Sequence, residues 1–204
     1  MSGYTYREGA GLAETARWAL YADSLVCATA VAIALAQGPW ALFYGDFAAV
    51  FSLVQLVTGL GSLILFLAWF YRANANVRAM GADGLMGSPG LSVAWFFIPI
   101  AFLFMPFVVM RDTWKASASP RDWQRQPTDP LLGFWWAAML ATHLAGSLSF
   151  RLWLSGDYDV VDAVGVLDLI SNGAAIFANL LCVAVMQKIR ALQVSPAHLS
   201  ETFR

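Results

Sequence analysis

Five long apolar runs dominate the sequence and limit what the chain can fold into. They lie near residues 17–38, 47–71, 91–110, 131–154 and 160–187. A helix needs about 20 predominantly apolar residues to cross the hydrocarbon core of a bilayer, and each run reaches that length. Across the chain 59% of residues are hydrophobic and 12% are charged, whereas charged residues make up about 25% of soluble domains. The sequence therefore predicts an all-α integral membrane protein.

Turn-forming residues separate the runs and mark loops rather than a second domain. They occur at Gly38-Pro39, at 81–90, at 117–130 and at Ser155-Gly156-Asp157. We therefore expect residues 1–204 to form a single transmembrane domain. The net charge of -1 offers no basic field for nucleic acid, and no Cys or His spacing typical of a metal site is present. We expect no nucleic acid partner, no metal and no cofactor.

The third run, residues 91–110, decides the topology because it contains Pro99 and Pro106. A proline inside a helix removes a backbone donor and crowds the preceding turn, at a cost of about 3 kcal/mol. The basic residues give a second test, because short cytoplasmic loops carry an excess of Lys and Arg. If all five runs cross, the 12 basic residues divide seven to five; if the third run re-enters, eleven share one side and only Arg151 lies opposite.

We therefore predict a helical bundle with four crossings, near residues 17–38, 47–71, 131–154 and 160–187, and with both termini in the cytoplasm. Residues 91–110 form a Pro-containing re-entrant or half-spanning segment in this prediction. The alternative is a bundle with five crossings, in which the third run is kinked but complete. Irregular backbone at membrane depth is tolerated only where protein or a watery cavity covers it, so a re-entrant segment is expected to pack among the other helices.

Two stretches around the third run carry a family resemblance. The stretch "FLAWFYRANANVRAMG" begins at Phe66, and "SPGLSVAWFFIPIAFLFMPFVVMRDTWKAS" begins at Ser88. Together they resemble the signature of a family of bacterial multi-pass membrane proteins known as domain of unknown function 4328. The residues that carry the resemblance are Trp69, Arg72, Asn76, Arg78, Trp95, Pro99, Pro106 and Trp114. The resemblance implies a bacterial membrane protein and supplies no activity.

The helix of the second run is predicted to continue about two turns beyond its apolar part, because no proline or glycine follows at once. Arg72 and Asn76 lie four residues apart and share one face of this helix. We expect that face to point toward the base of the re-entrant segment. The amides of Asn74 and Asn76 are then expected to bond backbone groups that Pro99 and Pro106 leave unpaired.

Polar side chains inside the runs are candidate functional residues, because a charged group at the centre of a membrane helix costs roughly 2.5 to 3.5 kcal/mol. Small and polar residues recur at three- and four-residue steps in three runs and therefore share faces. In the last run these are Gly165, Asp168, Asn172, Ala175 and Asn179; in the second, Ser52, Gln55, Gly59 and Ser62; in the fourth, His143, Gly146 and Ser147. One interpretation is packing, since such faces permit close approach and hydrogen bonds between helices.

The other interpretation is an ionisable path built from Asp23, His143 and Asp168. Histidine titrates near neutral pH, so these side chains suit proton relay or cation binding. Their different depths argue against one compact site and leave a path as the alternative. No nucleophile elbow, phosphate loop or pair of glutamates is present, so we expect no enzyme and no catalytic residue.

The sequence thus favours a structural, accessory or regulatory membrane protein that acts by helix packing, either with itself or with a membrane-protein partner. The alternative is a small channel, or a transporter coupled to protons or cations, that uses Asp23, His143 and Asp168. The expected surroundings are the lipid bilayer of the bacterial cytoplasmic (inner) membrane. The two functions differ in whether the intramembrane polar groups bond one another or line an open path.

Overall fold

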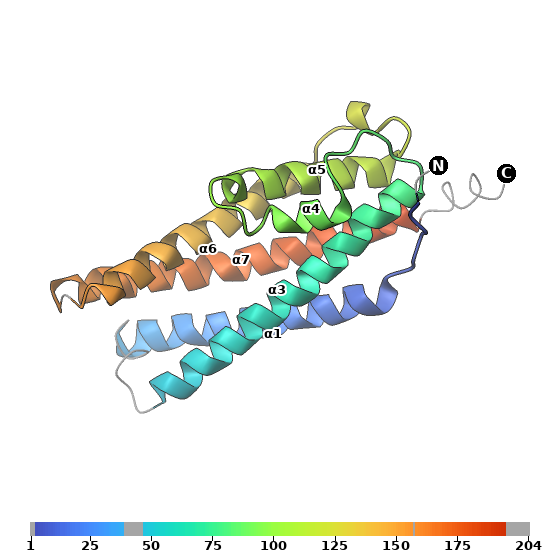
Figure 1. The fold of residues 1–204 in the computed structure, drawn as a ribbon. Coiled ribbons are helices and arrows are strands. Elements are labelled where there is room, and N and C mark those ends of the chain that lie inside the picture. Colours follow the sequence, from blue (N-terminus) through green and yellow to red (C-terminus); the bar gives the residue numbers. More distant parts are fainter. Residues whose placement is uncertain (1–2, 39–46, 157, 195–204) are drawn as a thin grey trace. The chain divides into compact units, whose positions relative to one another are not determined.

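A computed structural model describes residues 3–38, 47–156 and 158–194, and these residues contain helices and no strand. Four helices are long: α1 (Ala10–Gln37), α3 (Ala48–Ala79), α6 (Pro130–Leu154) and α7 (Val161–Gln193). The other elements are short: α4 (Pro89–Ala94), η1 (Ala101–Leu103), α5 (Met105–Ala118), η2 (Trp123–Arg125) and η3 (Tyr158–Val160). Figure 1 shows these elements coloured along the chain.

The four long helices contain 28, 32, 25 and 33 residues, and each is long and apolar enough to cross a membrane. They confirm the predicted all-α membrane bundle. Three of them extend beyond the apolar runs, since α1 begins at Ala10, α3 ends at Ala79 and α7 ends at Gln193. The more polar ends of these helices supply the candidate site described below.

Residues 91–110 do not form one continuous helix. They contain the end of α4, the short η1 and the start of α5, and Figure 1 shows α4 and α5 as separate helices beside the second half of α3. No helix of the described residues that is long and apolar enough to cross a membrane lies within residues 91–110. Pro106 lies in the first turn of α5, where its missing N–H removes no helical hydrogen bond.

The break in this segment lies at Pro99 and Ile100. Ile100 has φ 67° and ψ -54°, and the N–H of Ala101 donates to the carbonyl oxygen of Pro99 at 2.8 Å. Together these values define a γ-turn with positive φ, which is rare and strained for a β-branched residue. Ile100 is also 77% exposed. The apolar run is therefore interrupted by a tight turn whose side chain faces outward.

The described residues divide between two compact units. Unit 1 comprises those of Met1–Ala16, Ile64–Gly133 and Val183–Arg204, and unit 2 comprises those of Arg17–Leu63 and Phe134–Cys182. All the residues that carry the family resemblance fall in unit 1. The candidate intramembrane residues fall in unit 2: Asp23, His143, Asp168, Asn172 and Asn179. The two sets of candidate residues therefore have separate surroundings.

In unit 1, α3 ends in a Schellman motif. The N–H of Gly81 donates to the carbonyl of Arg78 at 3.1 Å, and the N–H of Ala82 donates to that of Val77 at 3.0 Å. Gly81 has φ 95°, a left-handed conformation that glycine adopts without strain. Val77 and Ala82 belong to a buried apolar cluster with Ala116 of α5. The end of α3 is therefore both capped and packed against α5.

Aromatic rings hold the end of α4 against α3 in unit 1. The ring of Phe96 lies 5.7 Å from that of Phe66 and 6.0 Å from that of Phe70, both edge to face. Edge-to-face pairs at such distances are favourable beyond the area they bury. These contacts hold Phe96, in the first half of residues 91–110, against α3. A hydrogen bond from Asn74 to Thr113, described below, holds α5 against α3.

Asp129 fixes the start of α6 in unit 1. Its Oδ1 accepts a hydrogen bond from the N–H of Leu131 at 2.9 Å, and its Oδ2 accepts one from Nζ of Lys188 at 3.1 Å. The backbone bond from Leu131 lowers the pKa of Asp129; burial opposes this shift and Lys188 adds to it. The Lys188 ammonium also lies 5.7 Å from the centre of the Trp114 ring. Lys188 therefore joins α7 to the start of α6 and to α5.

Candidate functional site

Two asparagines in the second half of α3 point to different sides of the helix. Successive residues of an α-helix are rotated by about 100°, so residues two apart lie roughly 200° apart. Asn74 and Asn76 are both buried. The amide of Asn74 faces α5, whereas that of Asn76 faces α7 and the N-terminal segment, residues 3–9.

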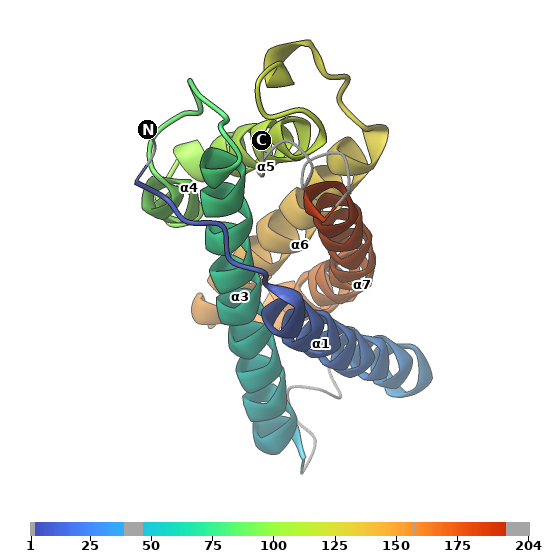
Figure 2. The same ribbon diagram turned by 90° about the vertical axis from the view of Figure 1, so that its right-hand side faces the viewer.

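Asn76 pairs with the backbone of the N-terminal segment. Its Nδ2 donates to the carbonyl oxygen of Arg7 at 3.0 Å, and its Oδ1 accepts from the N–H of Arg7 at 3.0 Å. This two-way contact resembles the pairing that an adjacent strand offers to an extended chain. Nδ2 also donates to Oε1 of Gln193 at 3.4 Å. Figure 2 shows the N-terminal segment passing across the end of α3.

Asn74 bonds α5 and its own helix. Its Nδ2 donates to Oγ1 of Thr113 at 2.9 Å, and its Oδ1 accepts from Nε of Arg78 at 3.1 Å. Thr113 in turn donates to the carbonyl of Val109 at 2.7 Å. The face of α3 that reaches α5 therefore carries Asn74 and Arg78, at i and i+4.

The expected partners of Arg72 and Asn76 were wrong. Their shared face points to the N-terminal segment and not to the re-entrant segment: Asn76 bonds Arg7, and a Cβ built on Gly9 would lie only 3.1 Å from Cδ of Arg72. Asn74 does reach α5, but its partner there is the Thr113 hydroxyl. The asparagine amides bond these groups rather than backbone freed by the proline breaks.

Gln193 closes the set of polar contacts from the last turn of α7. Its Nε2 donates to the carbonyl oxygen of Ala73 and to Oγ of Ser117, both at 3.0 Å. Ser117 donates to the carbonyl oxygen of Thr113 at 2.7 Å. We call this buried set the amide network: Ala73, Asn74, Asn76, Thr113, Ser117 and Gln193. It joins α3, α5, α7 and the N-terminal segment.

The amide network consists of uncharged groups that do not titrate near neutral pH. It therefore contains no side chain that gains or loses a proton near neutral pH. A buried polar network whose members are hydrogen-bonded favours one arrangement over others, because each alternative leaves a buried group unpaired. The chemistry of these residues suits holding four segments in a fixed arrangement.

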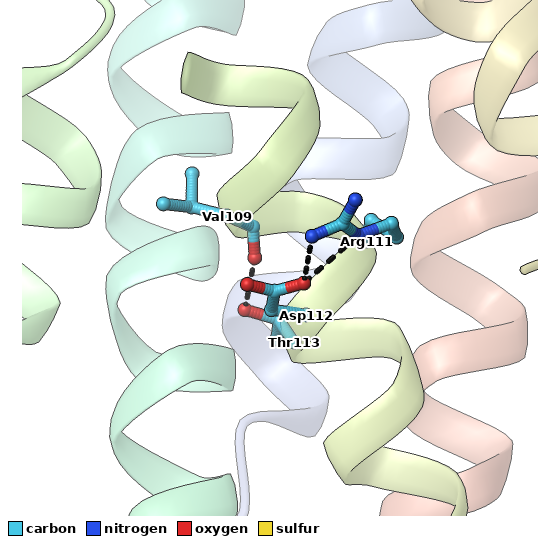
Figure 3. Close-up of polar contacts among 4 residues, drawn as sticks. All are labelled: Val109, Arg111, Asp112 and Thr113. Carbon is cyan, nitrogen blue, oxygen red and sulfur yellow. Dashed lines mark hydrogen bonds and ion pairs between the residues drawn. The ribbon is translucent and has the colours of Figure 1, made fainter. Parts of the chain in front are cut away.

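One ion pair lies beside the amide network on α5. Nε and Nη2 of Arg111 approach Oδ1 of Asp112 at 2.9 and 2.7 Å, as Figure 3 shows together with the Thr113 hydroxyl and the Val109 carbonyl. The Asp112 side chain is 10% exposed and that of Arg111 is 34% exposed. Adjacent helical residues do not normally face each other, so the guanidinium folds back to neutralise a buried carboxylate.

The other residues that carry the resemblance surround this network in unit 1. Trp69 is buried and lines a small cavity together with Arg72, Asn76 and Gln193. Trp114 is buried beneath Lys188. Pro99 and Pro106 stand at the turn and at the start of α5, and Trp95 follows α4. The residues of the motif therefore build one structural unit.

In unit 2, Asp23 bonds two other helices. Its Oδ1 accepts from Oγ1 of Thr58 at 3.1 Å, and its Oδ2 accepts from Nδ2 of Asn179 at 2.9 Å. A second contact joins Nε2 of Gln55 to Oδ1 of Asn172 at 2.9 Å. The polar faces of α3 and α7 thus meet each other and α1 through side-chain hydrogen bonds.

His143 and Asp168 have separate surroundings in unit 2. His143 is exposed, and its Nδ1 lies 2.9 Å from the carbonyl oxygen of Met139 on its own helix. Asp168 is half-buried, and its backbone carbonyl accepts from Nδ2 of Asn172 at 2.9 Å. Within the described part of the chain, no group of three His, Cys, Asp or Glu side chains is arranged to hold a metal ion. His198 lies outside the described residues.

The family model of a domain of unknown function, DUF4328, matches residues 40–191. This range covers most of the chain and includes every residue of the motif. The chain belongs to the DUF4328 family. No curated protein and no solved structure matches it. The DUF4328 match extends well beyond the stretch 65–117 on which the resemblance rested, and it takes in α6 and most of α7.

Three site residues of this DUF4328 chain were not singled out from the sequence. They are Thr113, Ser117 and Gln193. Thr113 bonds Asn74 across 39 residues of the chain, Gln193 bonds Asn76 across 117, and Ser117 bonds Gln193 across 76. A Gln in the polar last turn of a long helix gives no local sign that it is buried. Only the motif stretch that contains Thr113 and Ser117 pointed to this region.

Proposed function

We propose that this DUF4328 protein is an accessory or regulatory protein of the bacterial cytoplasmic membrane, is not an enzyme, and acts by helix packing with itself or with membrane-protein partners. The contacts of Asp23 carry this proposal. Both carboxylate oxygens accept hydrogen bonds from other helices, so the acidic group is engaged in joining α1, α3 and α7. Hydrogen bonds between side chains of different helices are the contacts by which membrane helices pack.

The surroundings of the other two candidate residues support the same choice. A relay needs its titratable groups within hydrogen-bond reach of each other or of bridging water. The ring of His143 bonds its own helix, whereas Asp23 bonds Thr58 and Asn179. These contacts favour packing over the transport alternative for Asp23, His143 and Asp168.

An exposed face of α1 supports association with another helix. Ala28, Ala32 and Ala36 are exposed and lie four residues apart, so they follow one another along the same side. Small residues at this spacing let membrane helices approach closely, and such packing drives association in lipid. This face suits a second copy of the chain or another membrane protein.

The distribution of basic residues supports cytoplasmic termini. Ten of the 12 lie in the ranges of unit 1, and only Arg17 and Arg151 lie in those of unit 2. Four crossings place the two termini on one side, and an excess of Lys and Arg marks the cytoplasmic side. The excess of basic residues in the ranges of unit 1 therefore favours cytoplasmic termini.

A flux and association experiment tests the function. In proteoliposomes with imposed proton and potassium gradients, we expect the wild-type protein to add no flux to that of empty vesicles. In the same lipid, Förster transfer between labelled copies should report association that Ala32→Leu weakens, because a larger side chain separates the helices. Ala137→Leu, the same change at an exposed position of α6, is the control. Flux that Asp23→Asn abolishes would overturn the proposal in favour of transport.

A labelling experiment tests the orientation independently. Gln126→Cys and Ser155→Cys place reporters at loops on opposite ends of α6, and the native thiols of Cys27 and Cys182 are buried. A membrane-impermeant maleimide added to intact cells should label Cys at position 155 and spare position 126 until the cells are opened. Labelling of position 126 from outside contradicts cytoplasmic termini.

A further inference from the structure

A groove in unit 1 lies between the N-terminal segment and α3, apart from the helix contacts on which the proposed function rests. Its volume is about 400 Å³. Tyr4 and Arg7 line it from the N-terminal segment, and Tyr71, Arg72 and Asn76 line it from α3. A space of this size admits a small polar headgroup or a substituted phosphate.

The charged lining of the groove is positive. Arg7 and Arg72 both contribute to it, and no carboxylate does. The nearest acidic residue along the segment, Glu8, lines the small cavity described above, which Arg72 and Asn76 also line. Arg111, Arg125 and Lys188 form ion pairs elsewhere, whereas no ion pair among the residues that the structure describes engages Arg7 or Arg72. Two arginines that line one space suit a phosphate, since a guanidinium presents a planar fork of donors to phosphate oxygens.

The remaining lining is apolar or aromatic. Leu12, Ala68 and Ala75 line the groove together with two tyrosines. Arg72 directly follows the apolar run 47–71 of α3, the place where a membrane helix leaves the hydrocarbon core. A phosphate carried by an amphiphile in the bilayer lies near this level, with its acyl chains beside the apolar part of the helix.

Local contacts hold both arginines in position. The backbone of Arg7 is fixed on both sides by Asn76, through bonds of 3.0 Å to its N–H and its carbonyl oxygen. The side chain of Arg72 runs close over Gly9, where a Cβ would lie 3.1 Å from Cδ. A groove whose ligands are placed before binding loses less entropy when the ligand arrives.

We propose that this groove binds the phosphate of an anionic amphiphile, with Arg7 and Arg72 as the phosphate ligands and Asn76 as a positioning residue. The shared chemistry is a phosphate ester. It can come from the headgroup of a phospholipid in the same bilayer or from a soluble phosphate ester, and the apolar lining favours the lipid.

Native mass spectrometry of the full-length protein in detergent tests the groove, with dioctanoyl phosphatidylglycerol as the probe. We expect phosphatidylglycerol to bind at least about tenfold more tightly than dioctanoyl phosphatidylcholine, which carries no net charge. The double variant Arg7→Gln/Arg72→Gln should lose at least about tenfold in affinity. Arg121→Gln/Arg125→Gln removes the same charge outside the groove and should retain the wild-type affinity.

Two further measurements keep the outcome clear. Arg7→Lys/Arg72→Lys keeps the charge without the planar fork, so partial binding is expected and separates loss of a ligand from loss of the fold. Glycerol 3-phosphate in competition distinguishes the sources: displacement of the lipid assigns the groove to a soluble ester, and no displacement assigns it to a headgroup. Equal affinity of the wild type and the groove double variant, or equal loss in both double variants, would overturn the proposal.

Discussion

Replacing Asn76 with alanine is expected to release the N-terminal segment and to lower the free energy of unfolding by about 2 kcal/mol, since a buried group left without its hydrogen bond costs about 1 to 3 kcal/mol. The asparagine pairs with both backbone groups of Arg7 and also donates to Gln193. The truncated side chain provides none of these bonds. Because Gln193 is only 6% exposed, water has little access to the oxygen that loses its donor.

Limited trypsin digestion measures the release, because cleavage after Arg7 requires the backbone to leave α3. If opening is fast relative to cleavage, the rate follows the population of the open form. Because about 1.4 kcal/mol corresponds to a factor of ten, a loss of about 2 kcal/mol is expected to accelerate cleavage roughly thirtyfold. Thermal unfolding in detergent gives the accompanying change in stability.

Two variants complete the comparison for Asn76. Asn76→Asp keeps the oxygen that accepts from Arg7 but loses the donor and buries a charge beside two acceptor oxygens, so its cleavage rate is expected to be at least that of Asn76→Ala. Gln124→Ala removes an amide from an exposed residue and should change stability by less than about 0.5 kcal/mol. Wild-type cleavage rates in Asn76→Ala would show that the segment is held by other contacts.

The membrane spans and the break between them followed from the sequence because the responsible forces are local. Runs of apolar residues specify spans by length alone. The two prolines act on their own helical turns, and they separate α4 from α5 in the structure. The positive φ at Ile100 had no such signal, because no glycine marks the turn.

The partners of polar residues were harder to predict because they depend on which helices become neighbours. Asn76 was placed on the correct face with Arg72, yet that face meets a segment 69 residues earlier in the chain. Gln193 bonds Ala73 across 120 residues. Periodicity predicts the direction in which a side chain leaves its own helix. It does not predict which other segment of the chain lies in that direction.

Asp23, Asn172 and Asn179 illustrate how far periodicity does reach in unit 2. The spacing of polar residues predicted that α7 presents a hydrogen-bonding face, and both asparagines bond side chains of other helices. Asp23 belongs to no periodic set of polar residues in α1, so periodicity did not predict its two partners. On α6, His143 and Gly146 lie three residues apart and were predicted to share one face. His143 is exposed in the structure, whereas Gly146 is half-buried.

Packing in unit 2 leaves little room at Gly146, and Gly146→Leu is expected to lower the free energy of unfolding by about 2 kcal/mol, as overpacking costs about 1 to 3 kcal/mol. A Cβ at this position would lie 3.0 Å from Oγ of Ser171. That hydroxyl donates to the carbonyl oxygen of Thr142 at 3.0 Å. A leucine therefore has to displace Ser171, break its bond to α6, or separate α6 from α7.

Gly133 on the same helix provides the matched control for Gly146→Leu. A Cβ at Gly133 would meet nothing within 4 Å, and glycine is less favourable than leucine in a helix by up to about 1 kcal/mol. Gly133→Leu should therefore leave stability unchanged or raise it, while Gly146→Leu lowers it. Denaturation of both variants in the same detergent measures the difference. Changes of the same sign and size would mean that helix propensity, and not the approach of Ser171, decides the effect, and close packing of α6 on α7 would then lose its support.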